Sequence, residues 1–248
     1  MPFRHALSAL LAGIAIVWSQ VAAAAPAPAP ATADVKIGDA TITLPILPGF
    51  AAPSATPKPL WDMMSHSLPP SNRMLAAMLP ADALQVPPPA NGDAAAGRVM
   101  GVQTFVAVEQ SGVSVDQFAE IKRIMREQNQ QLLANVKDDI KESTDRVSKD
   151  AAALSGDSST TVTSHDTASL GVFDEQPNSI SLAAVQTISV AMKKGSTDVR
   201  QVMGMSTLRL RGKALMVSVY SRYRTDADVE WVKAQVRAWV KRVNELNP

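Results

Sequence analysis

Two neighbouring segments near the C-terminal end alternate apolar and polar residues, and this alternation sets the strongest limit on how the chain can fold. They run from 199 to 211 and from 214 to 224, and Gly212-Lys213 between them is predicted to form a two-residue turn. One face of the resulting ribbon carries apolar side chains from both segments, namely Val202, Leu208, Leu210, Leu215, Val217, Val219 and Tyr223. Because alternation with a period of two decides which face is buried, we expect an antiparallel strand pair with one face in the core.

The segment after this pair predicts a long amphipathic helix. Thr225 and Asp228 have the spacing of a capping box. Apolar residues then recur at helical spacing, at Val229, Val232, Val236, Trp239 and Val243. Trp231 falls beside this stripe, so we expect it at the edge of the core.

A second helix is predicted over residues 115–135. Ser114 and Gln117 form its capping box, and an apolar stripe follows behind them. Residues 137–150 are mostly charged, and they either extend this helix or form a frayed arm.

The rest of the chain adds mainly strands. A hairpin is expected at 35–44 around Gly38-Asp39, and the other strand-like segments are 98–109, 160–163 and 179–192. The short apolar run 73–79 fits either a strand or a helix. This order predicts an α+β fold, in which helices pack on an antiparallel β-sheet.

The N-terminal residues are typical of an export signal. A basic start is followed by the apolar run 6–18 and by small residues, which predicts a signal peptide over 1–24 that is cleaved after Ala23 or Ala24. The alternative is an uncleaved anchor. The Ala/Pro-rich residues 25–33 are expected to form a spacer, and residues 34–248 a single domain. We therefore expect a periplasmic or secreted protein that has no transmembrane segment once the signal is removed.

The composition excludes several functional classes. The chain has no cysteine, so it has no disulfide, no thiolate nucleophile and no cysteine zinc site. The 24 Lys and Arg residues nearly balance the 23 Asp and Glu residues, and aromatic residues make up only 4%. This balance argues against nucleic acid as a partner. No phosphate-binding glycine loop and no metal-ligand spacing is present, so we expect neither a cofactor nor a metal site.

His66 and His165 are the histidines of the predicted domain. His165 lies between Ser164 and Asp166, and neighbours in sequence point in different directions on a strand. A catalytic triad needs side chains that converge in space, so His165 is interpreted as a solvated loop residue. No catalytic residue is assigned.

The uneven distribution of charged residues along the chain is the one sequence feature that indicates a binding surface. Residues 193–248 carry twelve Lys and Arg against five Asp and Glu, whereas residues 25–192 carry eleven against eighteen. The alternation places four arginines on the polar face of the C-terminal strand pair: Arg209, Arg211, Arg222 and Arg224. They are the candidate binding residues, for an acidic surface of a partner or of anionic lipid. The favoured alternative is that the protein's own helix 115–150 covers them, together with Met203, Met205 and Met216.

The order of elements resembles the Mog1/PsbP-like α/β/α sandwich, which includes the DcrB-type bacterial envelope proteins. The resemblance is carried by the hairpin VKIGDATITLPILPGF, the segment NRMLAAML, the capped helix SVDQFAEIKRIMREQ and the closing unit GKALMVSVYSRYRTDADVEWVKAQVRAWVKRVN. It spans residues 35–248 and implies a non-enzymatic helper or binding module, without assigning functional residues.

The expectation for function is an exported, soluble, non-enzymatic binding or accessory protein of the cell envelope. The alternative is an enzyme whose active site is assembled from residues far apart in the sequence, with His165 or His66 as the base.

Overall fold

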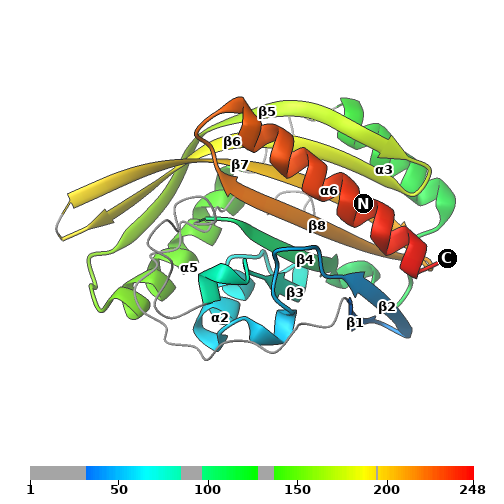
Figure 1. Cartoon of the computed structure of the whole chain (residues 1–248), viewed down its shortest axis with the longest axis horizontal. Coiled ribbons are helices and arrows are strands. Elements are labelled where there is room, and N and C mark those ends of the chain that lie inside the picture. Colours follow the sequence, from blue (N-terminus) through cyan, green and yellow to red (C-terminus); the bar gives the residue numbers. More distant parts are fainter. Residues whose placement is uncertain (1–31, 85–96, 128–136, 194) are drawn as a thin grey trace.

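A six-stranded antiparallel sheet forms the centre of the computed structural model, which describes residues 32–84, 97–127, 137–193 and 195–248 (Figure 1). The predicted signal peptide lies outside the described residues, as does most of the spacer. The strand order is β3-β4-β8-β7-β6-β5. The strands are β3 (Asn72–Met78), β4 (Val99–Phe105), β5 (Thr161–Gln176), β6 (Ser179–Met192), β7 (Gly195–Leu210) and β8 (Lys213–Arg222). Strands β1 (Thr32–Ile37) and β2 (Ala40–Pro45) form the predicted hairpin around Gly38-Asp39, which is a separate two-stranded sheet.

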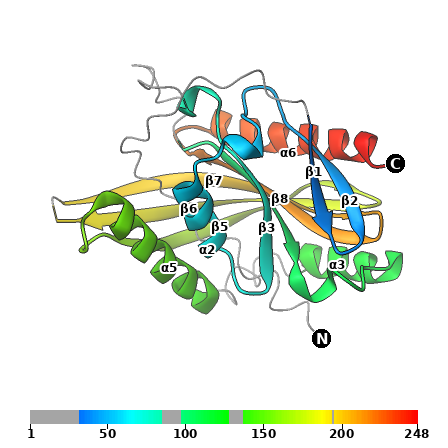
Figure 2. The ribbon, with the colours of Figure 1, turned by 90° about the horizontal axis from the view of Figure 1, so that it is seen from below.

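Helices cover both faces of the large sheet (Figure 2). Helix α6 (Asp226–Leu246) and the β1–β2 hairpin pack on one face, which we call the α6 face. Helices α2 (Lys58–His66), α3 (Val115–Glu127) and α5 (Lys137–Ser155) pack on the other, the α3 face. This arrangement confirms the predicted α+β class and the sandwich of helix, sheet and helix layers.

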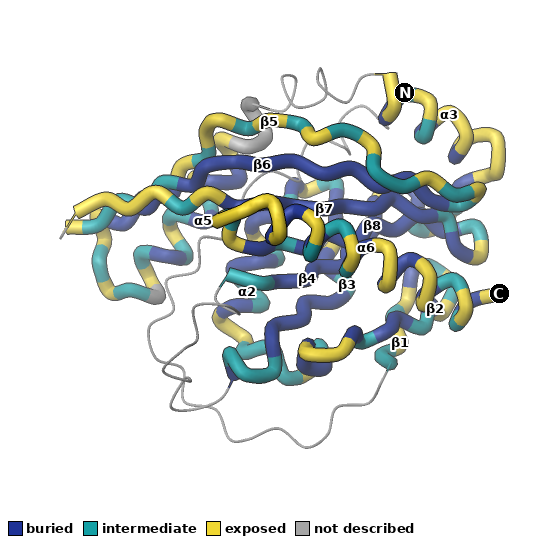
Figure 3. Tube along the Cα trace, turned by 45° about the horizontal axis from the view of Figure 1, so that its top comes forward, coloured by how far each residue is buried: buried dark blue, intermediate teal, exposed yellow. Residues whose placement is uncertain are grey.

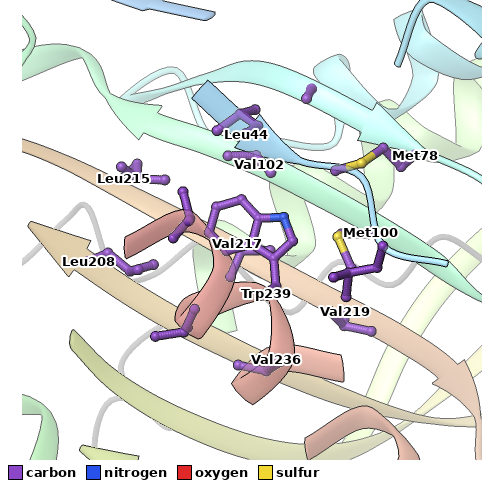
Figure 4. Close-up of a cluster of buried hydrophobic side chains, with 14 of the residues drawn as sticks. Leu44, Met78, Met100, Val102, Leu208, Leu215, Val217, Val219, Val236 and Trp239 are labelled. Atoms are coloured by element: carbon purple, nitrogen blue, oxygen red, sulfur yellow. The ribbon is translucent and has the colours of Figure 1, made fainter. Parts of the chain in front are cut away.

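The main core lies between α6 and the α6 face of the sheet (Figure 4). Trp239 is fully buried there, against apolar side chains from β4, β7 and β8. Gly204 of β7 allows α6 to come close: a Cβ atom at this position would lie 2.6 Å from Val232 Cγ1 and 3.1 Å from Val236 Cγ2. The predicted stripe of α6 and its capping box at Thr225 and Asp228 are both confirmed.

The β7–β8 pair has the predicted faces but a different turn. Arg211 and Gly212 form the two-residue connection, and both have positive φ, 48° and 77°. A tight hairpin favours this backbone because it matches the twist of the two strands. The predicted turn at Gly212-Lys213 is therefore wrong, and Gln201 lies opposite Arg222. The register differs from the prediction by two residues, so each side chain keeps its face.

Helix α3 begins at the predicted capping box. The backbone N–H of Ser114 donates to Gln117 Oε1 at 2.8 Å, and the N–H of Gln117 donates to Ser114 Oγ at 3.1 Å. Its apolar stripe covers the methionines of the α3 face, as expected: Phe118, Ile121 and Met125 pack with Met203, Met205 and Met216. The predicted continuation over 128–135 lies outside the described residues.

Residues 137–150 form neither an extension of α3 nor a frayed arm. They belong to α5, a separate helix of 19 residues. Val147 and Ala151 on α5 pack against Val162, Ile188 and Val190 of β5 and β6. Two apolar residues are enough to pack α5 on the sheet, because β5 and β6 supply the other side chains of this cluster.

Strand β5 is much longer than the predicted segment 160–163. It forms one edge of the sheet, and its register with β6 shifts at three places. Asp166 and Gly171 have positive φ at these irregularities. Bulges of this kind interrupt alternation and protect an edge strand from unwanted pairing. Figure 3 shows that β5 is largely exposed, in contrast to the buried central strands.

The ambiguous run 73–79 belongs to a strand, β3, and the residues around 60–66 form the nine-residue helix α2. None of the helices in the described ranges is both long enough and apolar enough to cross a membrane.

Candidate functional site

The four arginines predicted on the polar face of the strand pair lie in two groups, Arg209 and Arg211 at one end and Arg222 and Arg224 at the other. Arg209 lies on the α3 face, where its Nε donates to the backbone oxygen of Val113 at 2.6 Å. Arg211 lies in the hairpin turn, and its Nη1 donates to the backbone oxygen of Thr41 at 3.1 Å. Because the turn begins one residue earlier than predicted, Arg211 lies outside the strand and does not share the predicted face, whereas Arg209 does.

Arg222 and Arg224 lie at the other end of the strand pair. Arg222 is the exposed last residue of β8. Arg224 lies beyond the strand, and its guanidinium is 3.2 Å from Asp228 Oδ1. Asp228 Oδ2 also accepts the backbone N–H groups of Arg224 and Thr225, at 2.9 and 3.1 Å. Burial raises the pKa of Asp228, but these hydrogen bonds and the guanidinium outweigh it, so the net effect is a lowered pKa.

The helices of the α3 face do not neutralise the predicted arginines. Within the described ranges, no carboxylate of α3 or α5 pairs with Arg209, Arg211 or Arg222. Helix α3 covers the methionines by apolar packing, so the predicted cover is confirmed for those side chains and wrong for the charges.

Two other arginines lie close to the end of β8, on the α6 face. The guanidinium of Arg98, just before β4, is 4.1 Å from the centroid of the Trp231 ring on α6. The guanidinium of Arg200 on β7 is 4.7 Å from the centroid of the Tyr223 ring. Both rings pack against the main core, so each guanidinium rests on a fixed aromatic surface.

Three arginines differ from the others in their contacts. Within the described parts of the chain, nine arginines hydrogen-bond or pair with an oxygen atom, and the other three have no such contact. These three are Arg98, Arg200 and Arg222, which we call the sheet-end arginines. The pairing registers place all three where β4 begins and β8 ends.

The environment of Arg98 is unfavourable for its charge. Burial and the nearby Arg224 lower the pKa of Arg98, although Asp228 and Asp82 act in the opposite direction. Its Nε is buried and has no hydrogen-bond partner. A bound anion would relieve the first effect, because it would place a negative charge beside the guanidinium.

Carboxylates also lie near Arg200. The hydroxyl of Tyr223 donates to Asp226 Oδ1 at 3.1 Å, and this contact raises the pKa of Tyr223. Asp198 lies two residues before Arg200 on the same strand, so both side chains are on the α6 face. This end of the molecule therefore carries both signs of charge.

His165 is exposed, as predicted, but it belongs to a strand and not to a loop. It lies in β5, its Nδ1 is 2.9 Å from Asp166 Oδ2, and its Nε2 is 2.8 Å from Ser189 Oγ on β6. The positive φ of Asp166, 51°, brings the adjacent carboxylate to the ring, which a regular strand would prevent. The argument that sequence neighbours must point apart is therefore wrong at this bulge.

The protons of this group do not follow the pattern of a catalytic triad. Ser189 Oγ donates to Asp198 Oδ1 at 2.5 Å, so the single hydroxyl proton is held by a carboxylate. His165 can then approach Ser189 only as a donor, whereas a general base must accept the proton of the nucleophile. His66 is occupied differently: its Nδ1 is 2.9 Å from Asp150 Oδ2, which links α2 to α5.

Metal ligands do not gather anywhere in the described parts of the chain. There, no group of three or more His, Asp or Glu side chains has the geometry to hold an ion.

Sequence reasoning missed Arg98 and Arg200. Neither belongs to an alternating charged run, and each becomes notable only through its ring and its missing acceptor. The nearest sequence signal is Trp231, an aromatic residue beside the predicted buried stripe of α6.

Comparisons with known proteins concern the fold alone. No family model matches the chain, and no curated protein matches it. Two solved structures do: a mutant of the protein Mog1, at 15% identity and a TM-score of 0.35, and the Saccharomyces cerevisiae Ran-binding protein Mog1p, at 14% identity and a TM-score of 0.34. Each match covers 87% of this chain and 92% of the other. Both structures are of Mog1, a member of the family that the order of elements resembles; at these TM-scores the likeness contributes nothing to the assignment of a site or partner.

Proposed function

We propose that this protein is an exported, non-enzymatic binding module of the cell envelope, and that it recognises an acidic partner through the sheet-end arginines Arg98, Arg200 and Arg222. One observation carries the proposal: the three described arginines that have no oxygen partner lie at one end of the sheet, Arg98 and Arg200 on its α6 face and Arg222 at the same end on the opposite face.

The physical reason is that the N–H donors of these three guanidinium groups have no oxygen acceptor within the described parts of the chain. Each has N–H donors that a carboxylate can accept in pairs, and such charge-assisted bonds are stronger than neutral ones. Arg200 and Arg222 are exposed, and Arg98 is held against Trp231. An acidic partner could therefore reach them without a rearrangement of the core.

Export is supported by the sequence of residues 1–24, which has the charge and apolar pattern of a signal peptide. Cell fractionation and N-terminal sequencing test this part. We expect a mature chain in the periplasm or medium that starts at Ala24 or Ala25; recovery of the intact chain in the cytoplasm would refute export.

An enzyme remains the second candidate because His165 Nε2 lies within hydrogen-bond distance of Ser189 Oγ. The contact between Ser189 and Asp198 argues against it, since the hydroxyl proton is not available to the histidine.

The binding proposal is tested by pull-down from envelope extract with charge-reversed bait. The bait carries Arg98→Glu, Arg200→Glu and Arg222→Glu, and the control carries Lys36→Glu, Lys149→Glu and Lys241→Glu, three exposed lysines elsewhere on the surface. Any captured protein is then purified and its binding is measured directly. We expect salt-sensitive binding to the wild type and to the control, and none to the arginine variant. Equal binding to both variants would refute the proposal.

A further inference from the structure

We propose that the partner contributes an extended acidic segment, with one carboxylate on Arg98 and a second on Arg200, across the first turns of α6. This two-point site rests on the proposed function and specifies the chemistry of the ligand.

The strand registers place the two arginines on the same face. Val99 lies opposite Tyr220, so Arg98 is level with Ser221, and the backbone oxygen of Arg200 accepts the N–H of Tyr223. Strand β8 lies between them. With about 4.8 Å between strands and about 3.4 Å per residue, the two backbones are roughly 12 Å apart.

Stacking on an aromatic ring holds each of the two guanidinium groups in a fixed position before a ligand binds. Each ring covers one flat side of the guanidinium, and carboxylates bind at its N–H edge. The Nε of Arg98 is buried, so a carboxylate would bind this residue through its terminal Nη groups. Because the stacked side chains have already lost conformational freedom, binding costs less entropy than it would for a free arginine.

The gap between the two arginines argues against a single small anion. To share one phosphate ion, the two side chains would have to converge across β8 and give up part of their contact with the rings of Trp231 and Tyr223. An extended peptide advances about 3.4 Å per residue, so acidic residues four positions apart match the separation.

The carboxylates near Arg200 argue against a membrane surface. Asp198 and Asp226 are both exposed on this side of the molecule, and a uniformly anionic bilayer would meet them as well as the arginines. A peptide can place its own acidic residues on Arg98 and Arg200 and a donor or cation near Asp226. The mixed charge therefore favours a protein segment.

The test uses two peptides of equal charge and the full chain at low ionic strength. One peptide carries two glutamates four positions apart in a Gly/Ser background, and the other carries them side by side. We expect the spaced peptide to bind about fivefold more tightly, since a second exposed ion pair adds only a modest gain. Arg98→Gln or Arg200→Gln should abolish this preference, whereas the single variants Lys36→Gln and Lys241→Gln, each of which also removes one positive charge, should keep it.

Several results would overturn the two-point site. They are equal affinity for the two peptides, displacement of the spaced peptide by low millimolar inorganic phosphate, or arginine-dependent binding to phosphatidylglycerol vesicles without binding to the spaced peptide. The proposed function is judged separately: if the captured partner depends on the sheet-end arginines but the peptides are not distinguished, the function stands and the two-point site is wrong.

Discussion

The guanidinium of Arg98 lies 4.1 Å from the centroid of the Trp231 ring and thereby joins the start of β4 to helix α6. Replacing Trp231 with leucine removes the aromatic face but leaves an apolar side chain against the core. We expect the free energy of unfolding to fall by about 1 kcal/mol, the range of a cation–π contact that is partly shielded from water. Urea denaturation measures the change, and Trp231→Phe should restore part of it. Equal stability of the leucine variant and the wild type would show that the stacking contributes nothing.

Gly204 fixes how closely α6 approaches β7. A methyl group at this position would lie 2.6 Å from Val232 Cγ1, so Gly204→Ala should force the helix away and lower the free energy of unfolding by about 1–3 kcal/mol. Gly101→Ala is the matched control, because its Cβ would meet only Met74 Sδ, at 4.0 Å. Thermal and chemical denaturation of both variants test this, and a control as unstable as Gly204→Ala would contradict the close approach.

The contact between Asp39 and Lys213 predicts a pH dependence. Lys213 is buried, and its Nζ is 2.7 Å from Asp39 Oδ1 and 2.9 Å from the backbone oxygen of Glu109. The hydrogen bond from Lys213 lowers the pKa of Asp39. Because the folded-state pKa lies below the unfolded one, the stabilisation is complete above the unfolded value of about 3.9 and is lost as the pH falls through the folded value.

Comparison of the wild type with Asp39→Asn tests whether the stabilisation by Asp39 is lost at low pH, as expected. The wild type should be the more stable protein at pH 7, and the difference in urea midpoint should shrink below about pH 4. In a Lys213→Met background the aspartate should no longer confer this pH dependence. A difference that grows as the pH falls would mean that the sign is wrong.

Ser189 should be unreactive as a nucleophile. Its hydroxyl proton is donated to Asp198, and His165 contacts the same oxygen. We expect no covalent labelling of Ser189 by a fluorophosphonate probe under conditions in which a serine hydrolase reacts fully. Labelling that disappears in both Ser189→Ala and His165→Gln would favour the enzyme alternative.

Helix α6 and the faces of β7 and β8 could be predicted because their local signals agree. Thr225 and Asp228 mark the start of the helix, and the period of its apolar residues continues to Val243. The turn was placed one residue too late because Arg211 adopts positive φ, a conformation uncommon for a residue with a side chain.

Strand β5 and helix α5 could not be predicted for a different reason. Most of β5 is an exposed edge with bulges, so its apolar residues do not alternate. Helix α5 has a charged sequence, and its packing depends on Ile188 and Val190 of β6, a strand that follows it in the sequence. Local patterns carry no information about such partners.

The candidate site was only partly predictable. The excess of basic residues after position 193 points to the C-terminal strands, and of the four candidate arginines only Arg222 is among the sheet-end arginines. Arg98 and Arg200 come from other strands, and their lack of an oxygen partner can be recognised only once all neighbours are known.

The most direct measurement of the central claim is the NMR response of the arginine Nε–H groups during titration with the spaced acidic peptide. The account predicts that the signals of Arg98 and Arg200 shift together with one dissociation constant, while that of Arg242, which is paired with Glu245 on α6, does not move. Shifts at Arg242 or elsewhere with no change at Arg98 and Arg200 would contradict the claim that this end of the sheet binds the acidic partner.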